Sequence, residues 1–112
     1  MAIVMRMTWR GITPDDYDEV RRLANWVSNP APGGDAHIAS FDSEGVLHCT
    51  HAWDSTEQLN TFLEQRIFPA VASLGVTSKP DVEIDGCHEL FVPHINTITI
   101  PETDRILAAT PV

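Results

Sequence analysis

The first residues of the chain alternate between two kinds of side chain. Large apolar residues fall on one side of residues 2–10 and smaller or polar ones on the other, the apolar set being Ile3, Met5, Met7 and Trp9. A period of two with bulky apolar side chains predicts a β-strand that is buried mainly on one face. Gly11 marks the end of this strand.

A helical pattern follows the strand. Thr13 is a suitable N-cap and Pro14 suits the first helical position. Apolar residues then recur at spacings of three and four, at Tyr17, Val20, Leu23, Ala24 and Val27. This spacing predicts an amphipathic helix of about fifteen residues. The prolines and glycines of residues 28–36 (SNPAPGGDA) prevent its continuation.

Residues 36–41 and 46–53 are two further strand candidates, separated by residues 42–45 (DSEG). A type I turn with Gly45 in the left-handed region would join them as a hairpin with a bulge. In that register the residue numbers of opposing positions sum to 88. His37 is then opposite His51, and Cys49 is opposite Ala39.

A second helix and a fourth strand complete the pattern. The capping box of residues 55–58 (STEQ) precedes an apolar stripe that extends to Leu74, and Gly75 suits the helix end. Pro69 should kink this helix, because it has no N–H to donate. Residues 82–92 predict the fourth strand. The last twenty residues contain a β-prone run (HINTITI) and then a possible helical turn at 102–109.

The predicted order β-α-β-β-α-β is the split βαβ, or ferredoxin-like, arrangement of the α+β class. We expect a four-stranded antiparallel sheet in the spatial order 4-1-3-2, with two helices on one face. Residues 1–92 form the predicted domain. Residues 93–112 form a tail that we expect to contact a second copy of the chain, because edge strands accept added strands.

Composition and charge exclude several classes of function. The chain has 112 residues, of which 16 are acidic and 7 basic, and its formal net charge is -9. Such a chain is repelled by phosphate backbones, so we expect no nucleic-acid partner. No apolar run reaches the roughly 18–20 residues of a membrane span. Two cysteines do not form a disulfide framework, so we expect a cytoplasmic protein.

Three histidines fall on the apolar side of the predicted strands: His37, His51 and His88. Imidazoles in an apolar layer need hydrogen bonds or a cavity that holds a ligand. We therefore expect a small-molecule pocket in which these histidines are catalytic and transfer protons. The expected ligand-binding residues are Met7, Trp9, Tyr17, Phe41, Cys49 and Trp53. The alternative is that each histidine is structural and bonded within the protein.

No metal site is predicted. His37 and His51 could share an ion, but two ligands are fewer than a stable zinc site requires. His48 and His51 point to opposite faces of their strand. The gap between His51 and His88, about 10 Å across one intervening strand, suits a small ring between two imidazoles better than it suits an ion.

Several short segments resemble the dimeric α+β barrel superfamily, and within it the small proteins similar to antibiotic biosynthesis monooxygenases. These segments are residues 9–17 (WRGITPDDY), 37–39 (HIA), 52–55 (AWDS), 62–66 (FLEQR) and 69–70 (PA). The resemblance covers roughly residues 3–92. It implies a homodimer in which two sheets face each other and the helices lie outside.

The resemblance also implies a class of chemistry. It suggests a cofactor-free enzyme, monooxygenase-like or isomerase- or cyclase-like, that acts on a small aromatic or polyketide-like metabolite. Haem-degrading relatives tend to carry a histidine on the second helix, and residues 55–75 contain none. We therefore expect no cofactor. The alternative function is a non-catalytic ligand-binding or stress-associated dimer that uses the same cavity.

Overall fold

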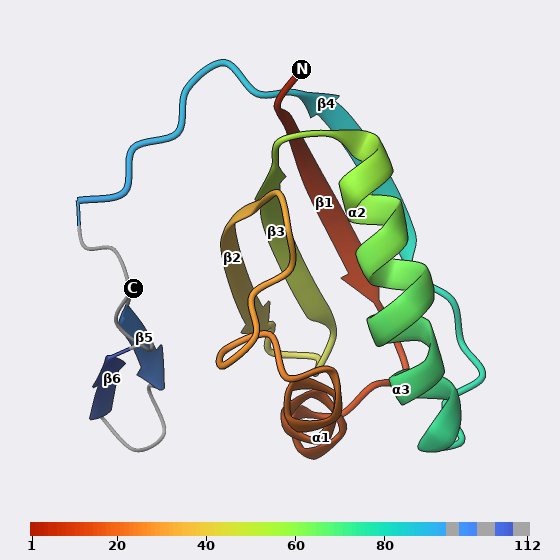
Figure 1. Ribbon diagram of the computed structural model, residues 1–112. Helices are drawn as coiled ribbons and strands as arrows, with labels where there is room; N and C mark the ends of the chain where they lie inside the picture. The colour runs from red at the N-terminus through yellow and green to blue at the C-terminus, as the bar shows by residue number, and fades with distance from the viewer. Residues whose placement is uncertain (94–96, 101–104, 109–112) are drawn as a thin grey trace.

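The computed structural model describes residues 1–93, 97–100 and 105–108. A four-stranded antiparallel sheet carries the helices on one face (Figure 1), and its strand order is β2-β3-β1-β4. This is the predicted ferredoxin-like fold with the predicted strand order. The elements are β1 (Ile3–Trp9), α1 (Pro14–Ala24), β2 (Gly34–Phe41), β3 (Leu47–Trp53), α2 (Thr56–Phe62), a π-helical segment (Leu63–Ile67), α3 (Phe68–Ser73) and β4 (Asp81–Gly86).

Helix α1 begins as predicted and ends early. Thr13 and Asp16 form a reciprocal capping box, with Pro14 in the first turn. The helix ends after Ala24 because Asn25 adopts the left-handed conformation, with φ at 53°. Asparagine tolerates this conformation better than most residues and often ends helices. The predicted continuation to about fifteen residues is therefore wrong, and residues 26–33 form the crossing to β2.

The β2–β3 hairpin has the predicted register. His37 is paired with His51, and Ala39 with Cys49. The turn is closed by a hydrogen bond from the Asp42 N–H to the Val46 carbonyl, and Gly45 has a φ of 79°. Strand β2 starts earlier than predicted, and its pairing with β3 is interrupted by a bulge between Gly34 and Ala36.

The second helical region is divided by the π-helical segment. Pro69 cannot donate a backbone hydrogen bond, and the Phe68 N–H immediately before it bonds to the Leu63 carbonyl, five residues back. In this wider turn the hydrogen bond reaches one residue further back than in an α-helix, and the extra residue accommodates the proline. The irregularity therefore lies directly before Pro69, at the place where the sequence predicted a kink.

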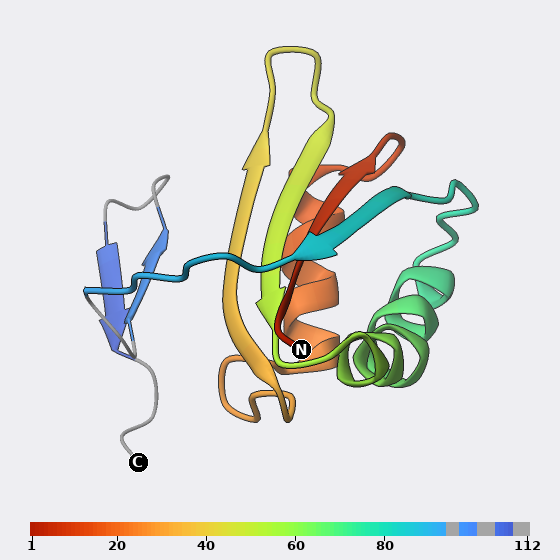
Figure 2. The ribbon, with the colours of Figure 1, turned by 90° about the horizontal axis from the view of Figure 1, so that it is seen from above.

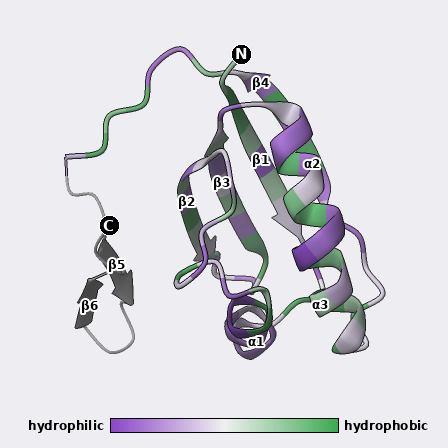
Figure 3. Ribbon diagram, in the orientation of Figure 1, coloured by the Kyte–Doolittle hydropathy of each residue, from purple (hydrophilic) through white to green (hydrophobic). Residues whose placement is uncertain are grey.

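The core lies between the sheet and the helices (Figures 1 and 3). Every second residue of β1 from Ile3 to Trp9 is buried, as the alternation predicts. Met5 and Leu59 are fully buried and are the centre of this layer. On β4 all residues are exposed, because this edge strand is only partly covered by the helices.

Strand β4 is shorter than the predicted 82–92, and this corrects the placement of His88. Its pairing with β1 ends at Gly86, opposite Ile3, and one more bond joins the Cys87 N–H to the Ala2 carbonyl. Because β1 supplies no further partner, the chain leaves the sheet. His88 is exposed and lies outside the strand.

The tail contains two further strands. Strands β5 (Thr97–Ile100) and β6 (Arg105–Ala108) pair antiparallel as a two-stranded sheet separate from the main one (Figure 2). Within the predicted helical turn at 102–109, residues 105–108 form a strand, which corrects that part of the prediction, and the other positions lie outside the described residues. In the part of the chain described above, no helix has the length and apolar character that crossing a membrane requires.

Candidate functional site

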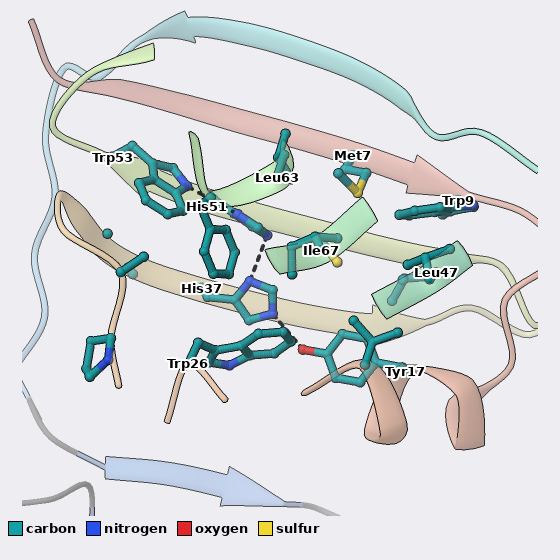
Figure 4. A pocket seen from close by; sticks show the side chains of 18 of the residues that line it. Met7, Trp9, Tyr17, Trp26, His37, Leu47, His51, Trp53, Leu63 and Ile67 are labelled. Carbon is teal, nitrogen blue, oxygen red and sulfur yellow. Dashed lines mark hydrogen bonds between the residues drawn. The ribbon is translucent and has the colours of Figure 1, made fainter. Parts of the chain in front are cut away.

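A cavity of about 200 Å³ lies between the sheet and the helices. Its wall includes residues from β1, α1, β2, β3 and the π-helical segment (Figure 4). Of the residues singled out from the sequence, the cavity is lined by Met7, Trp9, Tyr17, His37, Cys49, His51 and Trp53. Phe41 is not part of the lining and packs edge-on against the Tyr17 ring, and His88 is also absent from it.

Three polar side chains of the wall form a continuous hydrogen-bonded chain. The Tyr17 hydroxyl lies 2.6 Å from His37 Nε2, and His37 Nδ1 lies 2.7 Å from His51 Nε2. The chain ends at Trp53, whose indole Nε1–H donates to His51 Nδ1 at 3.2 Å. The hairpin register places the two histidines opposite each other, and the period of two places His51 and Trp53 on the same face of β3.

The cavity keeps both imidazoles neutral. His51 is buried, and desolvation lowers its pKa to about 3, with a further contribution from the neighbouring His37. His37 lies on the edge strand and remains partly open to solvent. Its ring packs against Tyr17, Trp26 and His51, and desolvation lowers its pKa to about 4.

Burial also suppresses ionisation of the other groups. It raises the pKa of the Cys49 thiol to about 12 and raises the pKa of Tyr17 well above its usual value. Near neutral pH the side chains of Tyr17, His37, Cys49 and His51 are therefore uncharged, and they form a polar strip on an otherwise apolar wall. Such a strip can fix the orientation of a ligand through hydrogen bonds.

Trp26 is a site residue that the sequence reasoning missed. Its ring lies 5.4 Å from the His37 ring and 6.0 Å from the Tyr17 ring, centroid to centroid. The sequence treatment placed Trp26 inside the first helix. Asn25 was the signal for an earlier end, because it is a common residue at helix C-termini.

Asp35 is a second lining residue that was missed, since the bulge in β2 was not predicted. Desolvation and a hydrogen bond with Asp54 raise the pKa of Asp35.

Cys49 brings a third potential metal donor near the two histidines. One ligand atom from each of His37, Cys49 and His51 lies within 4.8 Å of the others. However, a neutral imidazole that binds a metal through Nε2 carries its proton on Nδ1. On His51 that proton would face the indole N–H of Trp53. In the hydrogen-bonded arrangement described above, His51 Nε2 therefore carries a proton.

No protein-family model matches the sequence, and no curated protein sequence matches it. Solved structures do match the fold. The oxygenase SnoaB of Streptomyces nogalater, described as cofactor-independent and solved as a point mutant, is 17% identical, with a TM-score of 0.54 over 83% of this chain and 96% of that one. A candidate antibiotic biosynthesis monooxygenase from Caulobacter crescentus is 21% identical, with a TM-score of 0.59 over 79% and 91%.

A third match is Rv0793 of Mycobacterium tuberculosis, which is 14% identical with a TM-score of 0.55 over 80% of this chain and 98% of that one. The chain therefore has the ferredoxin-like fold of the antibiotic-biosynthesis-monooxygenase-like proteins, as the sequence resemblance implied. At these identities the similarity establishes the fold alone.

Proposed function

We propose that this chain is a cofactor-independent enzyme that acts on a small cyclic phenol or enol. The substrate ring would occupy the apolar cavity, and its oxygen would contact the Tyr17 hydroxyl. His37 and His51 would polarise that hydroxyl through their hydrogen bonds and so favour loss of the substrate's proton. The observation that carries the proposal is the hydrogen-bonded chain of these three side chains along the wall of the cavity.

The size of the cavity supports a small substrate. An apolar cavity of roughly 150 Å³ holds benzene, so about 200 Å³ suits one substituted ring. The rings of Trp26, Trp53 and Phe62 surround this space and would stack against a flat ligand.

The fold supports a monooxygenase-like reaction, because SnoaB shares it and is described as a cofactor-independent oxygenase. In such a reaction the ionised phenol would supply electrons to O₂. One oxygen atom would enter the ring to give a quinone, and the other would leave as water. Isomerisation or cyclisation of an ionised phenol or enol in the same cavity would need no O₂.

The lowered histidine pKa values favour a second candidate, a ligand-binding protein without catalysis. Imidazoles with pKa values of about 4 and 3 are weak bases at neutral pH. Such a protein would bind the same single-ring compounds in the same cavity and release them unchanged.

Oxygen consumption tests the enzymatic proposal. Mono- and bicyclic phenols, including 1,2,4-trihydroxybenzene, are incubated with the protein in an oxygen electrode, against blanks without protein. We expect protein-dependent oxygen uptake that falls at least tenfold in Tyr17→Phe and His51→Gln. His48→Gln is the matched control, because His48 bonds to Asp42 on the opposite face of the sheet. Turnover that survives both site changes would contradict the proposed roles. Binding without turnover would support the second candidate.

We also propose that the chain is a homodimer in which residues 93–112 contact the partner. The sheet face opposite the helices is uncovered in the single chain: Ile38 there is 68% exposed, and Arg6 forms ion pairs with Glu83 and Asp85. A sheet with a bare face and two free edges gains stability from a partner. Light scattering during gel filtration should give twice the chain mass of 12.4 kDa. A monomer at micromolar concentration would contradict the proposal.

A further inference from the structure

We infer that Trp53 fixes the direction of the hydrogen-bonded chain, so that Tyr17 presents its hydroxyl proton to the ligand. The site would then select a ring compound through an acceptor oxygen, and would bind a phenol or enol as its oxyanion. This inference deepens the proposed function and depends on the same cavity.

The indole of Trp53 determines the position of each proton. An indole N–H can only donate, so His51 Nδ1, 3.2 Å away, must be the acceptor without a proton. The proton of neutral His51 is then on Nε2, which donates to His37 Nδ1. For the same reason His37 carries its proton on Nε2, which donates to the Tyr17 oxygen. Figure 4 shows the four side chains in this sequence.

The opposite direction is disfavoured by the surroundings of Trp53. If Tyr17 donated to His37, the protons would shift along both rings, and the Nδ1–H of His51 would face the indole N–H. Trp53 and His51 are only 4% and 6% exposed, so little solvent is available to separate two such donors. The indole is also held in place, with Phe62 5.2 Å away, centroid to centroid, and with the ring close to Gly34.

The consequence is a hydroxyl proton that the protein itself leaves free. Among the described residues, the Tyr17 hydroxyl is hydrogen-bonded only to His37, and it needs an acceptor for its own proton. Hydrogen bonds that run in one direction polarise each other, so the last donor of this chain is strengthened. A fixed donor of this kind in a cavity stabilises an oxyanion.

The charged and titratable groups around the chain are one guanidinium, one thiol and one carboxyl group. The Arg21 guanidinium lies over the Tyr17 ring, 5.9 Å from its centroid, and forms an ion pair with Asp18. The Cys49 thiol is kept neutral by burial. Asp35 at the bulge of β2 is the acidic group of the lining and opposes a bound anion when it is ionised, although desolvation and the hydrogen bond with Asp54 raise its pKa.

The tautomers of the free protein test this direction without any ligand. Two-bond proton–nitrogen correlation spectra at neutral pH distinguish the bare nitrogen of each imidazole from the protonated one. We expect both His37 and His51 to carry their proton on Nε2. A proton on Nδ1 of either ring in the unaltered protein would overturn the inference.

A pair of tryptophan variants tests the role of Trp53 as a positioning residue. Trp53→Phe removes the donor, and we expect His51 to become a mixture of both tautomers. Trp9→Phe is the matched control: it removes an indole N–H that bonds to Ser78 and not to the chain, so the tautomers should stay unchanged. Unchanged tautomers in Trp53→Phe would show that another feature sets the direction, and would overturn the assignment.

A coloured phenol tests the ligand class. 4-Nitrophenol absorbs visible light only as its phenolate, so a titration reports the pKa of the bound compound. We expect that pKa to be lower than in water by at least one unit, and Tyr17→Phe to abolish the shift. An unchanged or raised pKa would overturn the inference. 4-Nitrotoluene has the same shape without the hydroxyl, and it reports binding to the apolar walls. If neither compound binds, the proposed function fails, and the tautomers still decide the direction of the chain.

Discussion

His37 and His51 occupy opposing positions on β2 and β3, and their rings are 4.3 Å apart, centroid to centroid. One ring belongs to the edge strand and the other to the interior of the sheet. The pair therefore joins an exposed position on the edge strand to a buried one in the interior. Protonation or removal of either ring should affect both the stability of the fold and the polar wall of the site.

Acidification should destabilise the protein through the buried histidine. The pKa of His51 is near 6.5 in the unfolded chain and about 3 in the folded one. Between these values the unfolded state binds the extra proton, so stability is present above pH 6.5 and falls as the pH is lowered. At pH 5 the loss from His51 alone is about 2 kcal/mol. Urea unfolding between pH 7.5 and 4.5 measures it. His51→Gln should make the free energy of unfolding less dependent on pH, and the control His48→Gln should not. If the pH profile of His51→Gln equalled that of the unaltered protein, the lowered pKa of His51 would be contradicted.

Removing the hydroxyl of Tyr17 should destabilise the fold as well as the ligand complex. In Tyr17→Phe, His37 Nε2 loses its partner at 2.6 Å, which should cost about 1–2 kcal/mol of unfolding free energy. A double-mutant cycle with His37→Ala isolates the interaction, because the hydroxyl has no partner there in the second background. We expect a coupling energy of at least about 0.5 kcal/mol, whereas strict additivity would show that the contact contributes nothing.

Two glycines with the same backbone conformation should respond differently to alanine. Gly33 and Gly45 have φ values of 84° and 79°. A methyl group at Gly45 meets no atom within 4 Å, whereas at Gly33 it would meet the Gln58 side chain, which accepts a hydrogen bond from Ser55. Gly45→Ala should cost about 1 kcal/mol from backbone strain, and Gly33→Ala should cost more. Thermal unfolding of the two variants compares them, and equal losses would contradict the close approach of Gln58 to Gly33.

The two cysteines should react at different rates with a thiol reagent. Burial raises the pKa of Cys49 to about 12, whereas Cys87 is partly exposed next to the end of β4. Dithiobis-nitrobenzoate should therefore modify Cys87 in the native protein, and Cys49 only after unfolding, since the thiolate is the reactive form. Cys87→Ser provides the control that isolates Cys49. Rapid native labelling of Cys49 would show that the cavity admits solvent and reagent freely.

A divalent transition metal should not displace the polar chain. Co²⁺ bound by the thiolate of Cys49 would produce an intense near-ultraviolet charge-transfer band. We expect no such band in the unaltered protein at neutral pH, because the thiol is protonated and the Nε2 of His51 carries a proton. Trp53→Phe removes one of these obstacles and should bind Co²⁺ more tightly. A band in the unaltered protein at micromolar Co²⁺ would identify a metal site.

The sequence was sufficient to predict the element order, the strand order and the facing pair of histidines. The decisive features were local: an alternating strand, a capping box, and a hairpin turn that sets the register of His37 against His51. Both helices were assigned correctly at their beginnings, where capping residues act. The end of the second helix was also correct, since Leu74 is its C-cap and Gly75 follows with φ at 77°. The early end of the first helix at Asn25 and the π-helical segment before Pro69 were not predicted, because hydrophobic spacing does not report such changes of the backbone.

The error at His88 had a different cause. Residues 82–92 alternate like a strand, but the length of a strand in a sheet is limited by its neighbour. Strand β1 begins at Ile3, so β4 has no partner beyond Gly86 apart from the bond at Cys87. The position of Trp53 relative to His51 was available from the period of two. The hydrogen bond between them depends on side-chain rotamers, which no sequence pattern specifies.

The π-helical segment separates the shape of the apolar side of the pocket from the arrangement of its polar groups. Leu63 and Ile67 line one side of the cavity from this segment, while the polar groups belong to α1, β2 and β3. A change of backbone register near Pro69 would reshape the apolar side and leave the polar chain where it is. The size of the cavity and the hydrogen bonds that it offers can therefore diverge independently in descendants of this chain.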